Sequence, residues 1–448
     1  MREITLFSSL GNKTETFVPL QEGKVSLYFC GPTVYNSPHI GNMRPAIVFD
    51  TWRRLFLSLG YDVTFVSNYT DVDDKIIHRA KELGISEKEL TESVIAEYRS
   101  IVDAVGSLQP DITPKPTVYM PQIIQYIDDL VKNGSAYASG GDVYFRVSSV
   151  KDYGCLSGNT PESLNSGARI EVNAQKESPL DFALWKKTGE GIKWDTPWSE
   201  GRPGWHTECC VMIDSIFRAQ DGYIDIHGGG FDLKFPHHEN EIAQAEAHNG
   251  NKLARYWLHN GFININNEKM SKSLGNVILA KDVVATYGGM PLRLMMLNAH
   301  YRAPLMFSEE TINEAVKNYQ KIATLVKQLA VALQLEGKDI ENLPKDTNTA
   351  FFDEMCADLN TPNALTILYQ DIKEANQALR VKERDYNALL NYFAKIKTEL
   401  YVLGIRADYP HLDEEDKKIY AEYMQAKANK DFALSDILRA RLAEKGVL

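Results

Sequence analysis

The chain has 448 residues, of which 44% are hydrophobic and 24% are charged, values that favour a globular protein of two to four domains. No apolar run approaches the roughly 20 residues that span a bilayer, and the N-terminus lacks the apolar region of a signal peptide, so we expect a cytoplasmic protein without a membrane partner. The net charge of −11 argues against a dedicated nucleic-acid-binding module, although a local basic face can still hold phosphates.

The first part of the chain alternates between strand-like and helix-like patterns. Residues 24–29 (KVSLYF) are rich in β-forming side chains, and residues 43–59 carry apolar side chains at helical spacings until Gly60. Residues 62–68 form a second predicted strand, and residues 73–83 a second predicted helix. A strand, a helix and a strand in this order predict a βαβ unit, and hence a parallel sheet that binds ligands at the carboxyl ends of its strands.

This pattern is interrupted in the middle of the chain. Four prolines break it between Gln109 and Pro121, and polar sequence rich in Gly and Ser follows to about Gly204. The α/β pattern resumes at Trp205, where TECCVMIDSIF favours a helix and YIDIHGGG favours a strand that runs into a loop. We therefore predict that residues 109–204 are an insertion between the two halves of a nucleotide-binding fold.

Long helical periodicities dominate from about Ser308 to Gly404, and a last helical segment is predicted at Lys417–Lys445. The sequence thus predicts an α/β fold: a Rossmann-like nucleotide-binding catalytic domain with a parallel sheet and an insertion, followed by an all-α helical bundle. The predicted units are residues 1–108 and 205–262 for the two halves of the catalytic domain, 109–204 for the insertion, 263–307 for a connecting region, 308–404 for the bundle and 405–448 for a small C-terminal region.

A short motif, Pro38-His39-Ile40-Gly41-Asn42, follows the first predicted strand and opens the first predicted helix. A glycine here lets a nucleotide approach the backbone, and the N-terminus of the helix favours negatively charged phosphates. His39 and Asn42 can each donate a hydrogen bond to a phosphate oxygen. A plain turn with a surface histidine would have the same sequence, so the motif alone does not decide.

A second motif, Lys269-Met270-Ser271-Lys272-Ser273, lies in the other half of the predicted fold and precedes Leu-Gly-Asn. Two lysines and two serines in a loop that ends at glycine can lie over a polyphosphate and stabilise the charge that develops during phosphoryl chemistry. A solvated basic loop is the alternative for such a stretch on its own. The two motifs, in this order and on opposite halves of a split α/β fold, together favour ATP chemistry.

The cysteines of the chain indicate either free thiols or a metal site. They are Cys30, Cys155, Cys209, Cys210 and Cys356. An odd and sparse set in a long chain does not form a disulfide framework. Buried free thiols are one interpretation of this set. A metal site is the other, and it requires histidine or carboxylate partners from elsewhere in the fold.

The segment FPHHENE supplies such partners. His237 and Glu241 are four residues apart, so on a helix both project from one face. With the thiolates of Cys30, which ends the first strand, and Cys209, they make a reasonable four-ligand zinc set. A solvated helix is the other interpretation of this segment. The spacing also leaves two alternative ligands open, His238 and Glu239.

The two motifs resemble the signature sequences of class I aminoacyl-tRNA synthetases, usually written HIGH and KMSKS. The second motif is complete, whereas the first has Asn42 in place of histidine, an amide that donates a hydrogen bond but carries no charge. The resemblance implies that His39, Gly41 and Asn42 contact ATP. It also implies that Lys272, together with Lys269, stabilises the transition state in which pyrophosphate leaves.

Longer segments resemble the cysteinyl-tRNA synthetases within this class, over roughly residues 24–307. They are FCGPTVYNSPHIGN, NYTDVDDKI, GRPGWHTEC, DIHGGGFDLKFPHHENE and KMSKSLGN. The resemblance implies that Cys30, Cys209, His237 and Glu241 bind one zinc ion. Zinc favours a thiolate over a neutral hydroxyl, so coordination of the substrate thiol would separate cysteine from serine without an editing domain.

The same resemblance implies further contacts in the site. The corresponding residues are Thr70, Trp205, His227 and Gly31 for cysteine, and Gly229 and Asp232 beside His39, Gly41, Asn42 and Lys272 for ATP. Read from the residues alone, the glycine run 228–230 suits a backbone packed against a flat ligand, although a tight loop at a strand end is the alternative.

The family's reaction joins L-cysteine and ATP as cysteinyl-adenylate, with release of pyrophosphate and with Mg²⁺ accompanying ATP. The cysteinyl group then passes to the 3′-terminal adenosine of tRNA(Cys). The resemblance implies a monomer in which residues 263–307 contact the tRNA stem, residues 308–404 bind tRNA and residues 405–448 bind the anticodon. Because the family usually continues beyond Leu448 into a short strand-rich piece, we expect this last region to be shortened.

Two other functions share parts of these motifs. A cysteine ligase that acts on an amino sugar, as in mycothiol biosynthesis, would use the same zinc and ATP machinery, but the long helical tail suits a tRNA ligand better. A zinc hydrolase with Glu239 as general base would leave both ATP-type motifs without a role. The ligation of cysteine to tRNA is therefore the function that the resemblance implies.

Overall fold

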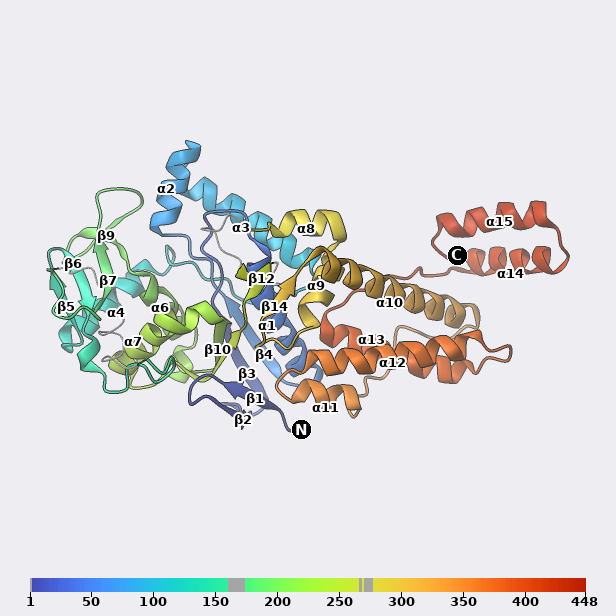
Figure 1. Cartoon of the computed structure of the whole chain (residues 1–448), viewed down its shortest axis with the longest axis horizontal. Coiled ribbons are helices and arrows are strands. Elements are labelled where there is room, and N and C mark those ends of the chain that lie inside the picture. Colours follow the sequence, from blue (N-terminus) through green and yellow to red (C-terminus); the bar gives the residue numbers. More distant parts are fainter. Residues whose placement is uncertain (1, 160–173, 266–267, 270–276) are drawn as a thin grey trace.

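The computed structural model describes residues 2–159, 174–265, 268–269 and 277–448. The molecule is elongated, with an α/β body at one end and helices at the other, and the C-terminal helices project farthest from the body (Figure 1). The predicted fold class is confirmed, because a parallel sheet forms the body and a helical region follows it. No helix within the described residues is long and apolar enough to cross a membrane.

The centre of the body is a four-stranded parallel sheet in the order β11-β10-β3-β4. Its strands are β3 (Lys24–Phe29), β4 (Asp62–Ser67), β10 (Ile224–Gly230) and β11 (Ala254–Asn260). Helix α1 (Ile40–Ser58) connects β3 to β4 and packs against both, which completes the predicted βαβ unit. The predicted strands 24–29 and 62–68 match β3 and β4 to within one residue.

Further helices belong to the body, and the last two of them lead into β10 and β11. They are α2 (Asp74–Leu83), α3 (Glu87–Ala104), α6 (Trp205–Ile216) and α7 (Glu239–Asn249). Asp73 begins α2 by accepting the backbone N–H of Lys75 at 2.8 Å. A 3-10 turn at Arg218–Gln220 follows α6, and after β10 a 3-10 turn at Phe231–Leu233 and a π-helical turn at Lys234–His238 lead into α7.

Strand β3 separates two hydrophobic cores because its side chains alternate between the faces of the sheet. Val25, Leu27 and Phe29 pack in the core that contains α1. Tyr28 and Cys30 pack in the second core, with side chains of α6 and α7. The alternation therefore turns Cys30 toward the helices that carry the other predicted metal ligands.

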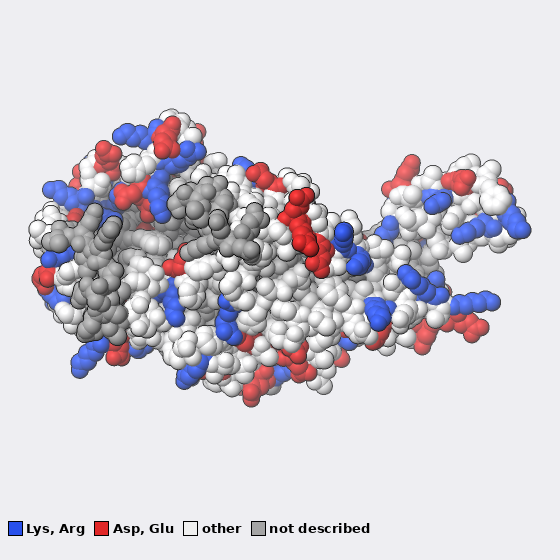
Figure 2. Space-filling model, in the orientation of Figure 1, with Lys and Arg blue, Asp and Glu red and all other residues white. Residues whose placement is uncertain are grey.

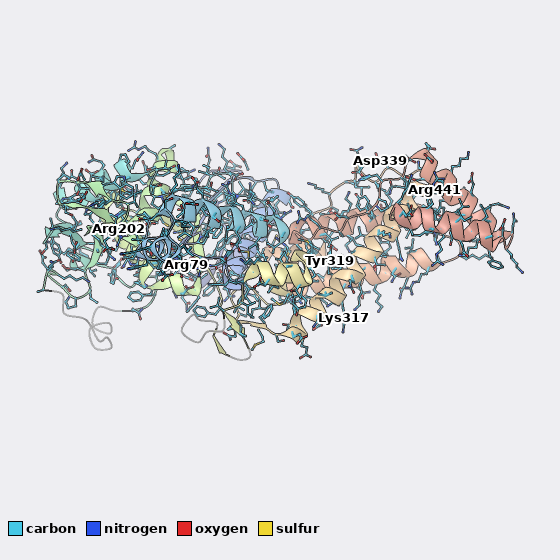
Figure 3. The ribbon with its side chains drawn as sticks, turned by 90° about the horizontal axis from the view of Figure 1, so that it is seen from above. Arg79, Arg202, Lys317, Tyr319, Asp339 and Arg441 are labelled. Atoms are coloured by element: carbon cyan, nitrogen blue, oxygen red, sulfur yellow. The ribbon has the colours of Figure 1, made fainter. Side chains whose placement is uncertain are left out.

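Residues 109–204 form a small sheet of their own, which is antiparallel and has the order β5-β6-β7-β9-β8. Its elements are α4 (Met120–Lys132), β5 (Ala136–Ser139), β6 (Asp142–Phe145), a 3-10 turn (Val147–Ser149), β7 (Phe182–Lys187), β8 (Trp194–Asp195) and β9 (Glu200–Pro203). Arg202 of β9 lies close to α2, the helix that carries Arg79 (Figure 3), and pairs with Asp74 there. The apolar side chains of this part pack in the second core.

Two small sheets flank the parallel sheet. Strands β1 (Thr5–Ser8) and β2 (Lys13–Thr16) form an N-terminal hairpin. The other small sheet has the order β13-β12-β14, with the helices α8 and α9 between β13 and β14 in the chain. Its elements are β12 (Ile263–Ile265), β13 (Glu268–Lys269), α8 (Ala280–Tyr287), α9 (Gly289–Leu297) and β14 (Leu305–Phe307).

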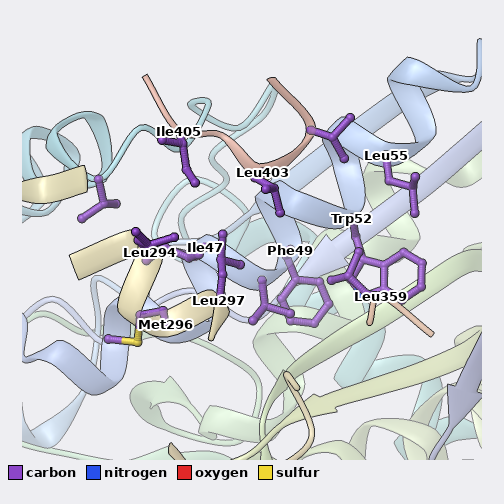
Figure 4. Close-up of a cluster of buried hydrophobic side chains, with 14 of the residues drawn as sticks. Ile47, Phe49, Trp52, Leu55, Leu294, Met296, Leu297, Leu359, Leu403 and Ile405 are labelled. Atoms are coloured by element: carbon purple, nitrogen blue, oxygen red, sulfur yellow. The ribbon is translucent and has the colours of Figure 1, made fainter. Parts of the chain in front are cut away.

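The helical part shares the first core with the body. Its helices are α10 (Glu309–Leu335), α11 (Ala350–Cys356), α12 (Thr361–Arg380) and α13 (Tyr386–Leu403). Figure 4 shows where side chains of α1 and α9 meet those of the bundle, among them Ile47, Phe49, Trp52, Leu55, Leu294, Met296, Leu297, Leu359, Leu403 and Ile405. Because this core is continuous, apolar packing fixes the bundle against α1.

A buried ion pair crosses the same contact. The guanidinium of Arg293, on α9, donates to Asp50 Oδ2 at 2.6 Å and to Ser107 Oγ at 3.0 Å. It also donates to the backbone oxygen of Leu403 at the end of α13. Both Arg293 and Asp50 are fully buried, and Arg54 gives Asp50 a second cationic partner at 2.8 Å. These contacts tie α1, α9 and α13 together.

The predicted last helical segment, Lys417–Lys445, is in fact two helices, α14 (Glu414–Ala428) and α15 (Phe432–Glu444). The chain reverses between them at Lys430, whose φ is 58°. Asp431 then caps α15 by accepting the backbone N–H of Leu434 at 3.1 Å. A left-handed residue followed by a capping aspartate ends one helix and begins the next, which helical periodicity alone does not reveal.

Candidate active site

A cleft of about 370 Å³ opens at the carboxyl ends of β3 and β10. Cys30 and Gly31 line it from the end of β3, and residues 230–233 line it from the end of β10. Residues 35–39 at the approach to α1 and side chains of α2 and α3 complete the wall. This edge is where a parallel α/β sheet binds its ligands.

The PHIGN turn forms the start of α1 beside this cleft. His39 is the N-cap residue, and Asn42 Oδ1 accepts its backbone N–H at 3.0 Å. His39, Gly41 and Asn42 all line the cleft, as does Pro45, which has no N–H to give to the Gly41 carbonyl as a helix normally requires. The positive end of the α1 dipole therefore lies at the cleft, which suits the phosphates of a nucleotide.

Backbone hydrogen bonds join the PHIGN turn to the segment that follows the KMSKS motif. Ile40 donates to the Ile278 oxygen at 3.0 Å, and Ala280 donates to the Pro38 oxygen at 2.9 Å. An antiparallel bridge forms between these two hydrogen bonds. The two motifs, which are more than 200 residues apart in the chain, therefore have directly connected flanks.

The two predicted catalytic lysines belong to the second motif itself. Lys269 ends β13, whose backbone pairs with Asn264 of β12. Lys272 lies outside the described residues. The roles of both lysines therefore stay predictions.

The four predicted zinc ligands converge on one side of the cleft from three separate segments. Cys30 follows β3, Cys209 lies in α6, and His237 and Glu241 lie in the π-helical turn and in α7. Their ligand atoms all lie within 4.8 Å of one another, and all four residues are buried. Because Cys30 also lines the cleft, a metal ion held here would be within reach of a bound substrate.

The distances within this cluster suit zinc. The Sγ atoms of Cys30 and Cys209 are 3.7 Å apart, Cys209 Sγ is 4.0 Å from His237 Nε2, and His237 Nε2 is 3.0 Å from Glu241 Oε1. Bonds of about 2.3 Å from zinc to sulfur and about 2.0 Å to nitrogen or oxygen place tetrahedral ligand atoms about 3.3 to 3.8 Å apart. The observed distances bracket this range, so the residues present fit a zinc ion.

Aromatic residues at the start of α6 orient the histidine of the cluster. The Nδ1 atom of His237 lies 3.0 Å from His206 Nδ1, and its ring stacks on Trp205 with 4.1 Å between centroids. Burial lowers the pKa of His206 to about 3, so that this ring is neutral. Partners of this kind fix the orientation of a ligand histidine and leave its other nitrogen, here Nε2, for the metal.

Electrostatics favour the coordinating forms of two of these ligands, Cys209 and Glu241, and disfavour those of Cys30 and His237, whose pKa values are raised. The hydrogen bond from Cys30 lowers the pKa of the Cys209 thiol to about 6, although burial opposes this shift. Burial raises the pKa of Glu241, but the nearby His237 and His227 outweigh it and hold the pKa well below its usual range. A thiolate and a carboxylate are the forms that bind zinc.

Glu239, one of the alternatives that the spacing leaves open, has a different role. Its carboxylate accepts the backbone N–H groups of Gly154 at 2.9 Å, Leu156 at 3.3 Å and Ser157 at 2.7 Å. These three groups belong to a loop of the 109–204 segment, and Glu239 is 1% exposed. Both carboxylate oxygens are therefore engaged, which leaves Glu239 neither as a ligand of this cluster nor as the general base of a hydrolase.

His238, the other alternative, belongs to a second group of donor atoms. Cys30, His227, His238 and Glu241 also lie within 4.8 Å of one another. This group shares Cys30 and Glu241 with the first, so the two groups are alternatives for one ion. His238 Nδ1 lies 2.8 Å from His259 Nε2, and His227 Nε2 lies 2.7 Å from Glu241 Oε2. The His227 contact is of the kind that orients a ligand from outside the set, whereas His238 keeps its Nε2, 3.3 Å from Cys30 Sγ, available for a metal.

The remaining predicted substrate residues fall into two groups. Gly31, Trp205 and Asp232 line the cleft. Among the described residues, Thr70, His227 and Gly229 do not line it but lie behind its wall, with Thr70 2% and His227 0% exposed. At Gly229 an added Cβ would lie 2.7 Å from Leu233 Cδ1, the end of a flexible side chain that can shift, so packing within the wall does not by itself require a glycine there.

Two further residues of the site, Asn68 and Glu208, were not predicted from the sequence. Asn68 is 1% exposed and accepts the backbone N–H of Gly31 at 2.9 Å. Glu208 is 1% exposed and accepts a hydrogen bond from Thr70 at 3.2 Å. Neither belongs to a catalytic pattern. The available signal was position, because Asn68 directly follows β4 at the carboxyl edge of the sheet and Glu208 directly precedes Cys209.

A parallel nucleotide-binding sheet whose edge joins a HIGH-type helix start to the flank of a KMSKS motif defines the catalytic domain of a class I aminoacyl-tRNA synthetase. Comparison with known families agrees with this class. Residues 16–317 match the family "tRNA synthetases class I (C) catalytic domain", and residues 350–407 match the "DALR domain".

Full-length relatives identify the family more narrowly. The cysteine–tRNA ligase of Shouchella clausii is 47% identical, and that of Halalkalibacterium halodurans is 46% identical; each alignment covers 99% of this chain and 97% of the relative. The cysteine–tRNA ligase of Acholeplasma laidlawii is 43% identical over 99% of this chain and 100% of its own length. The chain belongs to the cysteine–tRNA ligase family.

Solved structures of more distant proteins agree on the fold alone. A methionyl-tRNA synthetase of Mycobacterium tuberculosis bound by methionyl-adenylate has a TM-score of 0.61 at 14% identity and covers 92% of this chain and 96% of its own. A putative arginyl-tRNA synthetase of Campylobacter jejuni has a TM-score of 0.59 at 16% identity and covers 88% of this chain and 94% of its own.

Proposed function

We propose that this chain activates L-cysteine with ATP and transfers it to tRNA(Cys), and that Cys30, Cys209, His237 and Glu241 hold a zinc ion that selects the substrate. Membership of the cysteine–tRNA ligase family carries the ligase reaction. The observation that carries the zinc is the convergence of two thiols, an imidazole and a carboxylate beside the cleft. Zinc bound there would take the substrate thiolate as a further ligand, a bond that serine forms far less well.

The nucleotide lies along the start of α1 in this proposal. The helix dipole stabilises the phosphates, and His39 donates to a phosphate oxygen. Because Asn42 Oδ1 accepts the N–H of His39, the Nδ2 group of Asn42 supplies the donor for ATP. Asp232 lines the opposite wall and accepts from the ribose hydroxyls.

The chemistry has two steps. The cysteine carboxylate attacks the α-phosphorus of ATP, and pyrophosphate leaves with the electron pair of the broken P–O bond. The 2′-hydroxyl of the terminal tRNA adenosine then attacks the carbonyl carbon of the adenylate, and AMP leaves. Lys269 and Lys272, with the Mg²⁺ that accompanies ATP, neutralise the charge of the leaving pyrophosphate. Positioning and charge stabilisation carry the rate, since the protein forms no covalent bond to the substrate.

The tRNA extends from the cleft over the helical part of the molecule. A groove of about 1230 Å³ lies between the bundle and the hairpin of α14 and α15. The basic side chains that line it are Lys327, Arg380, Arg384, Lys427 and Arg439. Figure 2 shows Lys and Arg side chains along this end of the molecule. Positive charge along a groove supports binding of a phosphate backbone. A monomer in the cytoplasm is part of the same proposal.

Substitution of one ligand tests the zinc assignment. In Cys209→Ser, we expect zinc content to fall well below one ion per chain, because a neutral hydroxyl is a poor ligand. Cysteine-dependent ATP–pyrophosphate exchange should fall about 100-fold or more, since even changes outside a ligand set cost about 10- to 100-fold. Cys356→Ser is the matched control, because Cys356 is equally buried but lies in α11.

The outcome separates the assignment from its rivals. Loss of zinc and of exchange in Cys209→Ser, with both retained in Cys356→Ser, supports it. Full zinc content and full exchange in Cys209→Ser would remove Cys209 from the site. The group of Cys30, His227, His238 and Glu241 would then be the ligand set to test.

A further inference from the structure

We propose that Asn68 is a positioning residue of the cysteine site, whose carboxamide holds Gly31, Thr70 and Cys209 in their relative places. This role deepens the proposed function and rests on it. Asn68 is buried and, within the described residues, is not part of the cleft wall. It therefore acts through its neighbours and not by touching the substrate.

Asn68 lies where two parallel strands end side by side. It directly follows β4, and the backbone continues to pair with the segment after β3: Thr70 N–H donates to the Pro32 oxygen at 3.2 Å, and Val34 N–H donates to the Thr70 oxygen at 3.1 Å. These hydrogen bonds extend the parallel pairing beyond the sheet itself. The backbone that carries Asn68 is thus held by β4, which it follows, and by the segment after the neighbouring strand β3.

The chemistry of its partners fixes the orientation of the Asn68 carboxamide. A backbone N–H can only donate, so the atom that faces Gly31 N–H at 2.9 Å must be the oxygen, Oδ1. The Nδ2 group then donates to Thr70 Oγ1 at 3.1 Å. Because the Thr70 oxygen accepts this bond, its own proton is available for Glu208 Oε2 at 3.2 Å. The result is a directed chain of hydrogen bonds from Asn68 to Glu208.

Close packing holds Gly31 against the backbone of Asn68, where this chain of hydrogen bonds begins. A Cβ at position 31 would lie 1.7 Å from the backbone oxygen of Asn68, so only glycine fits there. Gly31 lines the cleft, and its neighbour Cys30 is a predicted zinc ligand. A shift of Asn68 would therefore move both the wall of the cleft and the end of β3.

The same oxygen reaches the second thiol. Asn68 Oδ1 lies 3.9 Å from the Sγ of Cys209, a packing contact when that sulfur is a thiolate, and Glu208 at the end of the hydrogen-bond chain is the residue before Cys209 in α6. One side chain therefore links the strand that carries Cys30 to the helix that carries Cys209. Neither aspartate nor leucine could replace it, since the site needs one donor and one acceptor on the same short planar group.

Kinetics of three variants test this role. We expect Asn68→Ala and Asn68→Asp to raise KM for cysteine by about 10- to 100-fold in ATP–pyrophosphate exchange, as loss of an orienting partner outside a ligand set typically does. The KM for ATP should change by less than about threefold, because the PHIGN turn is held by hydrogen bonds of its own, from His39 N–H to Asn42 and from Ile40 N–H to the Ile278 oxygen. Thr70→Val, which removes the hydroxyl at nearly constant volume, should give the same pattern.

The control is Asn360→Ala, which removes a capping asparagine at the start of α12 and leaves the site alone. A double variant, Asn68→Ala with Thr70→Val, should raise KM for cysteine little more than either change alone, because both break one chain. If Asn68→Ala fails to fold, Asn68→Asp, which keeps the shape of the side chain, still decides.

Three outcomes are distinguishable. A selective rise in KM for cysteine in the Asn68 and Thr70 variants supports the positioning role. Unchanged KM for cysteine, or an equal rise in KM for cysteine and ATP, would overturn it and leave Asn68 with packing alone. If the parent chain itself shows no cysteine-dependent exchange, the proposed function fails instead.

Discussion

At the start of α1, the amide side chain of Asn42 accepts one hydrogen bond and keeps donors at the cleft. Its oxygen accepts the N–H of the capping residue His39, which is the helix-capping role, and its nitrogen retains two donors at the cleft. Asparagine can therefore stand in the last position of the HIGH motif, where the class usually has histidine. A group that can become charged, such as imidazole, is not required at position 42 for these hydrogen bonds.

We expect Asn42→Ala to weaken the binding of ATP more than that of cysteine. Loss of a hydrogen bond to a charged phosphate, together with a weaker helix start, should raise KM for ATP about 10- to 100-fold. The KM for cysteine should change much less, because the proposed zinc ligands Cys30 and Cys209 pack in the core on the other face of the sheet. Asn133→Ala is a matched control, since Asn133 also accepts a nearby backbone N–H, that of Ser135 at 2.9 Å, but in the 109–204 segment. An unchanged KM for ATP would contradict the role of Asn42.

The same scale shows what the sequence could and could not predict. The spacing of His237 and Glu241 placed both side chains on one helical face, and their atoms do lie 3.0 Å apart. Spacing does not separate His237 from His238, or Glu241 from Glu239, because their roles depend on contacts with segments distant in the chain. His238 contacts His259, and Glu239 binds a loop more than 80 residues before it.

At the scale of elements, the alternation of β3 is the feature that assembles the site. A period of two residues sends Leu27 and Phe29 toward α1 and sends Cys30 toward α6 and α7. The sequence KVSLYF predicts this strand, and the structure confirms it. The partner helices were predicted as well, but their packing on that face is a tertiary contact that the local sequence does not reveal. The break between α14 and α15 was missed because one left-handed residue, Lys430, decides it.

A buried acid of α13, Glu399, makes the free energy of unfolding depend on pH. Burial, and then the charge of Asp371, raises the pKa of Glu399 to about 9, against an ordinary value of 4.5. Asp371 itself pairs with Lys395 at 2.7 Å. Because the folded pKa lies above the unfolded one, the stability from neutral Glu399 is full below about pH 4.5 and is lost as pH rises through about 9.

The free energy of unfolding should therefore fall as pH rises from about 5 to about 9, a slope that Glu399→Gln should reduce. Glutamine keeps the shape of the side chain and stays neutral throughout this range. Glu374→Gln, at a less buried position of α12, is the control and should keep the parent's slope. Denaturant unfolding at several pH values measures the effect. A parent slope that Glu399→Gln leaves unchanged would show that Glu399 is ionised in the folded protein.

At the scale of the whole molecule, the body and the bundle form one continuous core. Arg293 and the side chains around Trp52 and Leu403 connect α1, which begins at the nucleotide end of the cleft, to the helices that extend toward the C-terminus (Figures 1 and 4). The distance between the cleft and the bundle side of the far groove is thereby set by packed helices, whereas α14 and α15 pack in a third, separate core. Such a spacing suits a ligand as long as a tRNA, which must reach both.

The basic groove gives a prediction at this scale. Reversing two charges on the C-terminal hairpin, with Lys427→Glu and Arg439→Glu, should raise KM for tRNA about 10-fold or more and reduce the salt dependence of aminoacylation. Cysteine-dependent ATP–pyrophosphate exchange, which needs no tRNA contact there, should stay at the parent's level. The control pair is Lys13→Glu with Lys132→Glu, two exposed lysines on the body. Equal KM values for tRNA in the two pairs would contradict binding in the groove.

Selection of cysteine by a protein-bound zinc ion is tested most directly by ATP–pyrophosphate exchange before and after removal of metal. We predict about one zinc ion per purified chain, loss of cysteine-dependent exchange when a chelator removes it, and recovery when zinc, but not magnesium alone, is returned. Serine should support little exchange in any of these states. Exchange that persists with cysteine after the zinc has gone, or that serine supports equally well, would contradict the zinc-based selection.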